Sequence, residues 1–453
     1  MADPFLLCHA CGPYEFTIAG PLTPVSIRDQ MIRAKMFADR AVERGIISPS
    51  RDLLVVGGGA AGVTAAIRAA QLGIKTTLVE ASHHCFGRQK GCTTRWVDPA
   101  QYDWPADHWD RGMYPWAPPP MPLPWGAQIS SVIAAVWERE FRRAQARFRN
   151  LKFLPRTTVI SIAYNTRSND LAVMLSGSVR PASYGAALIC VGFGMEKASL
   201  GTYSSFQYWD SDPLESRGLG QPRNIQCVLI AGGGDGALQD FLRVTTGMQS
   251  ARKLFESLPA DAREPIAAAI HSAEDQAQRA GIWCERQHEH AVFKRLHRVY
   301  LDQVPKLLSD ARVETALDAA LSHSKGLEIT LAYPCDHFSR CYGLNRLLVL
   351  LILEYADRKG LAIRELASTG LDSVTRKNYG HRCANSAAAC HGEKHEVRFL
   401  AFPSCVSGKT GLATTAPTVF DAVILRLGVT PPPPFAGSPL LFTRQILPYH
   451  ASQ

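Results

Sequence analysis

The sequence predicts a mixed α/β protein with two parallel-sheet units, and three observations lead to this class. An apolar run, a glycine cluster and a helical stretch follow one another at residues 53–72 and again at 228–244. An aliphatic run ending in glycine comes after each, as YGAALICVG at 184–192 and FDAVILRLG at 420–428. Around these stretches helical and strand-like segments alternate, which is typical of layered α/β folds.

The elements follow in order along the chain. Apolar residues recur at helical spacing or in short β-type runs, so that each segment can be assigned from its period. Helices are expected at 26–46, 60–72, 129–147, 236–244 and 342–360, with further helices across 237–322. Strands are expected at 52–56, 75–80, 152–191, 326–334 and 395–402. A stretch crowded with Pro, Trp and Tyr at 98–126 predicts an ordered covering loop.

These elements divide the chain into four segments. We expect an N-terminal arm and helix at 1–50 and a first α/β domain with the covering loop at 51–204. A second α/β domain with a large helical insertion follows at 205–428, and a return segment at 429–453 ends the chain.

The composition is that of a folded globular protein. The chain has 453 residues, of which 46% are hydrophobic and 20% charged. Its net charge of +9 comes without a dense Lys/Arg run, so we expect a basic surface rather than a nucleic-acid partner. The sequence suggests neither a membrane span nor a secretory signal, so a cytoplasmic protein without a membrane partner is expected.

The first glycine cluster fits the dinucleotide-binding pattern GxGxxG. Gly57 allows the tight turn, Gly59 lets the backbone approach a pyrophosphate, and Gly62 lets the helix pack closely on the strand. The pyrophosphate would lie on the helix N-terminus, and Glu80, at the end of the next strand, would accept hydrogen bonds from an adenosine ribose. The residues of the loop are Gly57, Gly58, Gly59, Ala60, Ala61 and Gly62.

The segment DLLVVGGGAAGVTAAIRAAQLGIKTTLVEAS resembles the FAD-binding start of flavoproteins with two dinucleotide-binding domains. This broad group contains the pyridine nucleotide-disulfide oxidoreductases and the flavin monooxygenases. AALICVGFG resembles the strand near the end of their first FAD segment, although Cys190 and Val191 depart from the usual Ala-Thr. The resemblance implies a Rossmann-like FAD-binding domain. Further cofactor contacts are then expected at Ala81, Arg88 and Gly192.

The resemblance also implies an FAD-dependent oxidoreductase that acts on a small-molecule substrate by flavin hydride or oxygen chemistry. Two alternatives stay open. One is an NAD(P)H-dependent flavin monooxygenase or reductase, and the other is a flavin- or nucleotide-binding sensor, or a module for a partner protein, without turnover. The sequence singles out no catalytic acid, base or nucleophile.

The second glycine cluster contributes Gly232, Gly234 and Asp235 as further candidates for cofactor contact. In the resembling families NAD(P)H docks at this place. Two features disfavour it here, because Asp235 would repel a pyrophosphate and no strand with a ribose acid follows the helix at 236–244. We therefore expect FAD as the one tightly bound dinucleotide, with NADH and NADPH bound weakly or not at all.

Cysteines and histidines offer two other hypotheses. Cys85 and Cys92 follow Glu80 where disulfide reductases carry a redox pair, but their spacing is wider, so we expect packed thiols. The basic neighbours Arg88, Lys90 and Arg95 could neutralise phosphates. A second set lacks the spacing of a standard zinc site, so no metal is predicted. Its members are Cys335, His337, Cys341, Cys383, Cys390 and His391.

Overall fold

The structure is a computed structural model that divides the chain into two compact units, each described here by itself. The first unit holds the described residues up to Pro99, from 121 to Met195 and at 429–430, and the second holds 100–106 and those from Glu196 to Gly428. The residues described are 3–18, 26–106, 121–216, 219, 225–283, 289–338, 341–382, 389–402, 412–413 and 416–430.

The first unit is built on a six-stranded sheet with the order β1-β2-β11-β3-β4-β7. Its strands are β1 (Ala10–Gly12), β2 (Glu15–Thr17), β3 (Leu53–Val56), β4 (Thr76–Val79), β7 (Leu151–Leu154) and β11 (Ala186–Ile189). The five strands from β2 to β7 are parallel, and β1 runs antiparallel to β2. Every residue of β3, β4 and β11 is buried, as expected for parallel strands covered on both faces.

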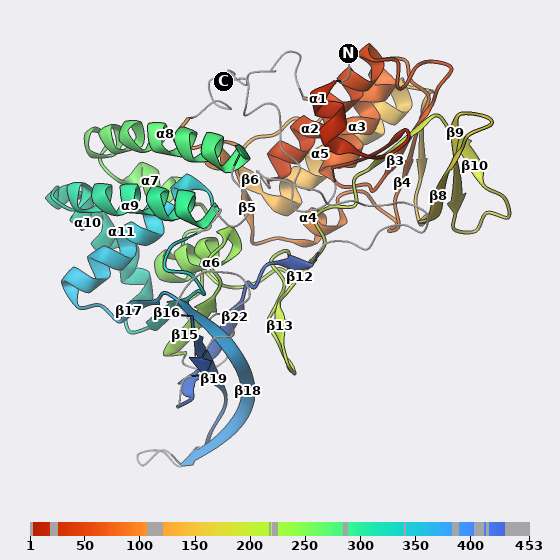
Figure 1. Cartoon of the computed structure of the whole chain (residues 1–453). Helices are drawn as coiled ribbons and strands as arrows, with labels where there is room; N and C mark the ends of the chain where they lie inside the picture. The colour runs from red at the N-terminus through yellow and green to blue at the C-terminus, as the bar shows by residue number, and fades with distance from the viewer. Residues whose placement is uncertain are drawn as a thin grey trace. The chain divides into compact units, whose positions relative to one another are not determined.

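Helices cover one face of this sheet and a small antiparallel sheet covers the other. The helices are α1 (Pro4–His9), α2 (Ile27–Glu43), α3 (Ala60–Gln71), α4 (Gly87–Gly91) and α5 (Ser130–Arg147). Figure 1 shows α2 beside α3, with which it packs. The other face is covered by β8 (Val159–Asn165), β9 (Asp170–Leu175) and β10 (Ala182–Tyr184), whose Ile162 and Val173 pack against Leu54 and Ile189.

The second unit repeats this plan with a four-stranded parallel sheet of order β17-β16-β15-β22. Its strands are β15 (Cys227–Ala231), β16 (Glu328–Ala332), β17 (Ile363–Leu366) and β22 (Ala422–Leu425). One face packs against α6 (Asp235–Thr246), α7 (Ala251–Ser257), α8 (Ala260–Trp283), α9 (Glu289–Leu307), α10 (Ala311–Leu321) and α11 (Gly343–Lys359).

The other face of the second sheet is covered by an antiparallel ribbon, drawn as the long blue arm in Figure 1. Its strands are β18 (Thr369–Arg382), β19 (Ala389–Ala401), β20 (Leu412–Ala413) and β21 (Thr418–Phe420). The remaining short elements are β5 (Trp96–Val97), β6 (Gln128–Ile129), β12 (Met195–Glu196), β13 (Ser199–Leu200), β14 (Tyr203–Ser204), β23 (Val429–Thr430) and the 3-10 turns Ala100–Tyr102 and Ser322–Ser324.

The predicted fold class is confirmed: both units are α/β, and a large helical insertion interrupts the second. One expectation was wrong in part: a parallel strand does follow the second glycine helix, although the residue after that strand is Tyr333 and not an acid. The strand is β16, which pairs with β15 but lies after the inserted helices α7–α10. The domain boundaries after residues 50 and 204 stay predictions, and residues 107–120 of the expected covering loop lie outside the described ones.

In the part of the chain that the structure describes, the helices are either too short or too polar to cross a membrane.

Candidate functional site

The first glycine loop joins β3 to α3, and two of its glycines have no room for a side chain. Gly57 has φ +108°, and a Cβ there would lie 2.5 Å from the carbonyl oxygen of Cys190. A Cβ at Gly62 would lie 1.9 Å from the oxygen of Gly57. Strand β11 and helix α3 therefore both press against this turn, which only glycine permits.

The third glycine of the loop faces open space instead. Gly59 is the N-cap of α3, and no described atom lies within 4 Å of the position that its Cβ would take. The first N–H groups of a helix have no partner within the helix, and its dipole favours negative charge at that end. The loop therefore forms a cradle that fits a pyrophosphate.

Glu80 brings a carboxylate to the edge of this cradle. It directly follows β4, and its Oε2 accepts a hydrogen bond from the N–H of Gly58 at 2.6 Å. Its Oε1 accepts from the N–H of Ser82 at 2.7 Å, next to the exposed Ala81. Each carboxylate oxygen keeps a further lone pair, so both can still accept from ribose hydroxyls.

On the other side of the loop, the end of β11 meets the basic segment after Glu80. Gly192 has φ +83°, and two residues later the oxygen of Gly194 accepts from both terminal nitrogens of Arg88 at 3.4 Å. Arg88 is exposed, whereas Lys90 pairs with Glu138 at 2.9 Å and Arg95 is buried. Of the three basic residues, Arg88 is the one that contacts the segment following β11.

Cys85 and Cys92 are buried, and neither forms a disulfide. The Sγ of Cys85 lies 3.0 Å from the position that a Cβ on Gly58 would take, directly under the glycine loop. Burial, followed by the nearby Glu80, raises the pKa of the Cys85 thiol to about 12. A thiol that stays protonated at neutral pH is a poor nucleophile, so the geometry favours a packing role.

The second glycine loop, between β15 and α6, repeats the geometry of the first. Gly232 has φ +144°, and a Cβ there would lie 2.3 Å from the oxygen of Arg426, the residue that follows β22. Gly234 is the N-cap of α6, and no described atom lies within 4 Å of its Cβ position. The second loop is therefore also a cradle with an open third glycine.

The carboxylate of Asp235 is bonded to the start of α11. Its Oδ1 accepts a hydrogen bond from the N–H of Tyr342, the N-cap residue of α11, at 2.7 Å and another from Nδ2 of Asn345 at 3.1 Å. Burial raises the pKa of Asp235 to about 7, against the lowering effect of these two bonds. The repulsion of a pyrophosphate expected from the sequence is therefore weakened. The carboxylate already accepts two hydrogen bonds, and burial favours its protonated, uncharged form.

Tyr333 occupies in the second unit the place that Glu80 has in the first. In the first unit the last residue of β3, Val56, pairs with Val79 of β4, and Glu80 follows. In the second unit the last residue of β15, Ala231, pairs with Ala332 of β16, and Tyr333 follows. A Cβ on Gly233 would lie 3.2 Å from the Cβ of Tyr333. The sequence missed this residue because the inserted helices separate β16 from β15, and the strand GLEITLAYP could have indicated it.

The candidate metal ligands do not come together among the described residues: no three or more His, Cys, Asp or Glu side chains there are placed to hold a metal ion. His337 instead bonds through Nδ1 to Asp336 at 2.7 Å. Cys383 and the side chains of Cys390 and His391 lie outside the described residues.

Residues 52–114 match the family described as FAD dependent oxidoreductase, which confirms the predicted resemblance over the first glycine loop and Glu80. No curated protein matches the chain.

Among solved structures, the bacillithiol disulfide reductase of Staphylococcus aureus has 11% identity and a TM-score of 0.42, covering 84% of this chain and 77% of that one. The thioredoxin reductase of T. acidophilum has 11% identity and a TM-score of 0.37, covering 83% and 77%. That of Lactococcus lactis has 11% identity and a TM-score of 0.39, covering 87% and 83%.

We predict that Cys85 and Cys92 take no part in electron transfer. An anaerobic dithionite titration of the flavin-loaded wild type should consume about two electrons per FAD, and the Cys85→Ser/Cys92→Ser variant should consume the same. An uptake of about four electrons by the wild type that drops to about two in the variant would show a redox-active disulfide.

We predict that Asp235→Asn flattens the pH dependence of stability. A carboxyl whose pKa is higher in the folded than in the unfolded protein makes the wild type lose stability as pH rises from about 4 to about 7. The asparagine can still accept both bonds but carries no charge. The melting temperature of the variant relative to wild type should therefore increase across this window, and a constant difference from pH 4 to 8 would contradict the prediction.

Proposed function

We propose that the protein, an FAD-dependent oxidoreductase by the match of residues 52–114, holds FAD on the first glycine loop. The pyrophosphate would bind the N–H groups at the start of α3, over the open position of Gly59. The adenosine ribose would donate to Glu80, and Arg88 would compensate phosphate charge.

The observation that carries this proposal is the combination of a blocked and an open glycine at one helix N-terminus. At Gly57 and Gly62 a side chain would collide with backbone atoms of the protein. At Gly59 no described atom of the protein stands in the way of a side chain. A ligand that approaches the backbone closely supplies the missing reason for a glycine there. Glu80, whose Oε2 accepts from the N–H of Gly58 at 2.6 Å, supports binding of the adenosine on that side of the loop.

FAD supplies hydride or oxygen chemistry when bound, and the protein supplies binding, orientation and charge. For the electron donor we propose a nicotinamide dinucleotide at the second glycine loop, bound more weakly than FAD. Two observations favour this beyond the sequence: the open cradle at Gly234 and the engagement of Asp235 with α11. This makes a reductase or a monooxygenase a stronger candidate than the sequence alone did.

A small-molecule substrate and a cytoplasmic location are part of the same proposal. The rival is a flavin-binding sensor or partner-binding module, which would hold FAD without a substrate-dependent cycle of reduction and oxidation.

We predict that Gly59→Val removes FAD without unfolding the protein. The valine has space in the protein but occupies the place of the pyrophosphate, so the flavin absorbance per chain of the purified protein should fall at least about tenfold. Glu80→Ala should weaken FAD binding less, by roughly the worth of one or two charge-assisted hydrogen bonds. The matched control is Gly126→Val, another open glycine of the first unit.

A folded Gly59→Val protein with the flavin content of the control would rule out this loop as the FAD site.

We predict that Gly234→Val abolishes nicotinamide binding and leaves the FAD content unchanged. NADH and NADPH are titrated calorimetrically into the FAD-loaded protein, and anaerobic flavin bleaching reports reduction. If neither nucleotide binds or bleaches the wild type, the second loop has no nicotinamide role and an oxidase or a binding module is left.

A further inference from the structure

At the end of the second sheet, a tyrosine and a glutamate form a hydrogen-bonded pair that no sequence motif indicated. The hydroxyl of Tyr333, which follows β16, donates a hydrogen bond to Oε1 of Glu365 on the neighbouring strand β17. The ring of Tyr333 is buried against Phe338, with ring centres 4.9 Å apart, and Glu365 is exposed. The carboxylate thus stands one strand further from the glycine loop than Glu80 does in the first unit.

Resting on the proposed nicotinamide site, we propose that Tyr333 and Glu365 select a dinucleotide with an unphosphorylated adenosine ribose, NADH over NADPH. Tyr333 stands at the position from which an acidic residue binds the ribose in sites of this kind, but its side chain is only 1% exposed. The ribose hydroxyls therefore donate to the exposed carboxylate of Glu365, which the hydroxyl of Tyr333 holds in place.

Strand alternation places Tyr333 and Glu365 on the same face as the glycine helix. Leu331 and Ile363 pack into the helical core, and side chains two residues further along a strand return to the same side. Ala332 and Leu366 pack towards the antiparallel ribbon on the opposite face. The pair therefore lies on the side of the sheet where α6 begins and where the adenosine must lie.

A 2′-phosphate in this position would meet negative charge. Glu365 would lie beside the ribose, and Asp336, whose charge Lys294 partly offsets, follows Tyr333 by three residues. Two charges close together in a partly buried site cost far more than on an open surface. The carboxylates therefore oppose the additional charge of NADPH while they accept from the hydroxyls of NADH.

Three described basic side chains that could approach Tyr333 and Glu365 already make other contacts. Lys294 on α9 forms an ion pair with Asp336. Arg364 lies on the opposite face of β17, where its Nε donates to Oγ1 of Thr330 at 3.1 Å. Arg346 is buried and donates to the oxygen of Phe338 at 2.7 Å. A 2′-phosphate would have to recruit one of them away from its present contact.

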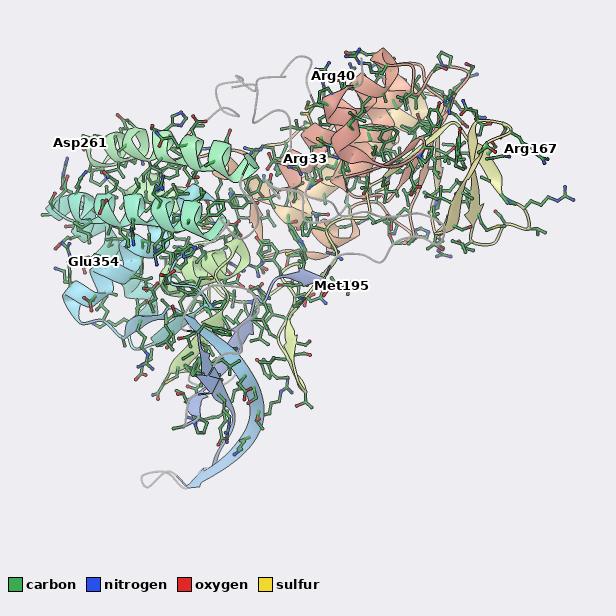
Figure 2. The ribbon with its side chains drawn as sticks, in the orientation of Figure 1. Arg33, Arg40, Arg167, Met195, Asp261 and Glu354 are labelled. Atoms are coloured by element: carbon green, nitrogen blue, oxygen red, sulfur yellow. The ribbon has the colours of Figure 1, made fainter. Side chains whose placement is uncertain are left out.

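The experiment measures dissociation constants of NADH and NADPH for the FAD-loaded protein, in wild type and in Glu365→Gln, Glu365→Arg and Tyr333→Phe. The matched control is Glu354→Gln, which removes an exposed carboxylate from the later turns of α11, labelled in Figure 2. We expect the wild type to bind NADH about tenfold or more tightly than NADPH. Glu365→Gln should narrow this ratio, Glu365→Arg should invert it, and the control should leave it unchanged.

Tyr333→Phe should weaken NADH several-fold and NADPH less, because it removes the hydrogen bond that positions the Glu365 carboxylate, to which only an unphosphorylated ribose donates fully. Equal or tighter binding of NADPH by the wild type, or a ratio unmoved by Glu365→Arg, would overturn the inference while the nicotinamide site itself stands. Absence of binding for both nucleotides overturns the nicotinamide site together with this inference, and the FAD content then still reports on the first loop independently.

Discussion

The close approach of a strand-end carbonyl to the first glycine of each loop is the constraint on which both units depend. Because β11 and β3 pair in parallel, the oxygen of Cys190 reaches Gly57 so closely that a Cβ would lie 2.5 Å from it. The same pairing of β22 with β15 places the oxygen of Arg426 against Gly232, at 2.3 Å from a Cβ. This contact fixes where each following helix begins, and the helix N-terminus determines where an anion can bind.

On this shared frame the two units differ at a few equivalent positions. Glu80 presents its carboxylate directly at the first loop, whereas the second unit has an aromatic ring there and its acid, Glu365, on the next strand. Cys190 is replaced by Arg426, whose Nε donates to Asp240 of α6 at 2.8 Å. The first unit thus has its carboxylate directly beside the glycine loop, whereas in the second a tyrosine hydroxyl holds the carboxylate of the neighbouring strand.

The helical insertion explains why the second sheet was hard to find in the sequence although its strand order is regular. Helices α7–α10 separate α6 from β16, yet they bury their apolar faces in the same core as β15 and α11. The hydrophobic gain from that shared core lets a long segment enter between neighbouring strands without changing their order. Proximity along the chain, which made Glu80 easy to find, is absent for Tyr333 and Glu365.

The sequence by itself determined the α/β class, both glycine turns, the buried helix α11 and the acid at position 80, because each depends on residues close together in the chain. Only the tertiary structure decided that β16 pairs with β15, that Asp235 is hydrogen-bonded to the start of α11, and that Glu365 lies beside Tyr333. These facts depend on which distant strands pair and which helix ends meet. Local period and spacing carry no information about such pairings, since the free energy that selects them comes from burial across the whole unit.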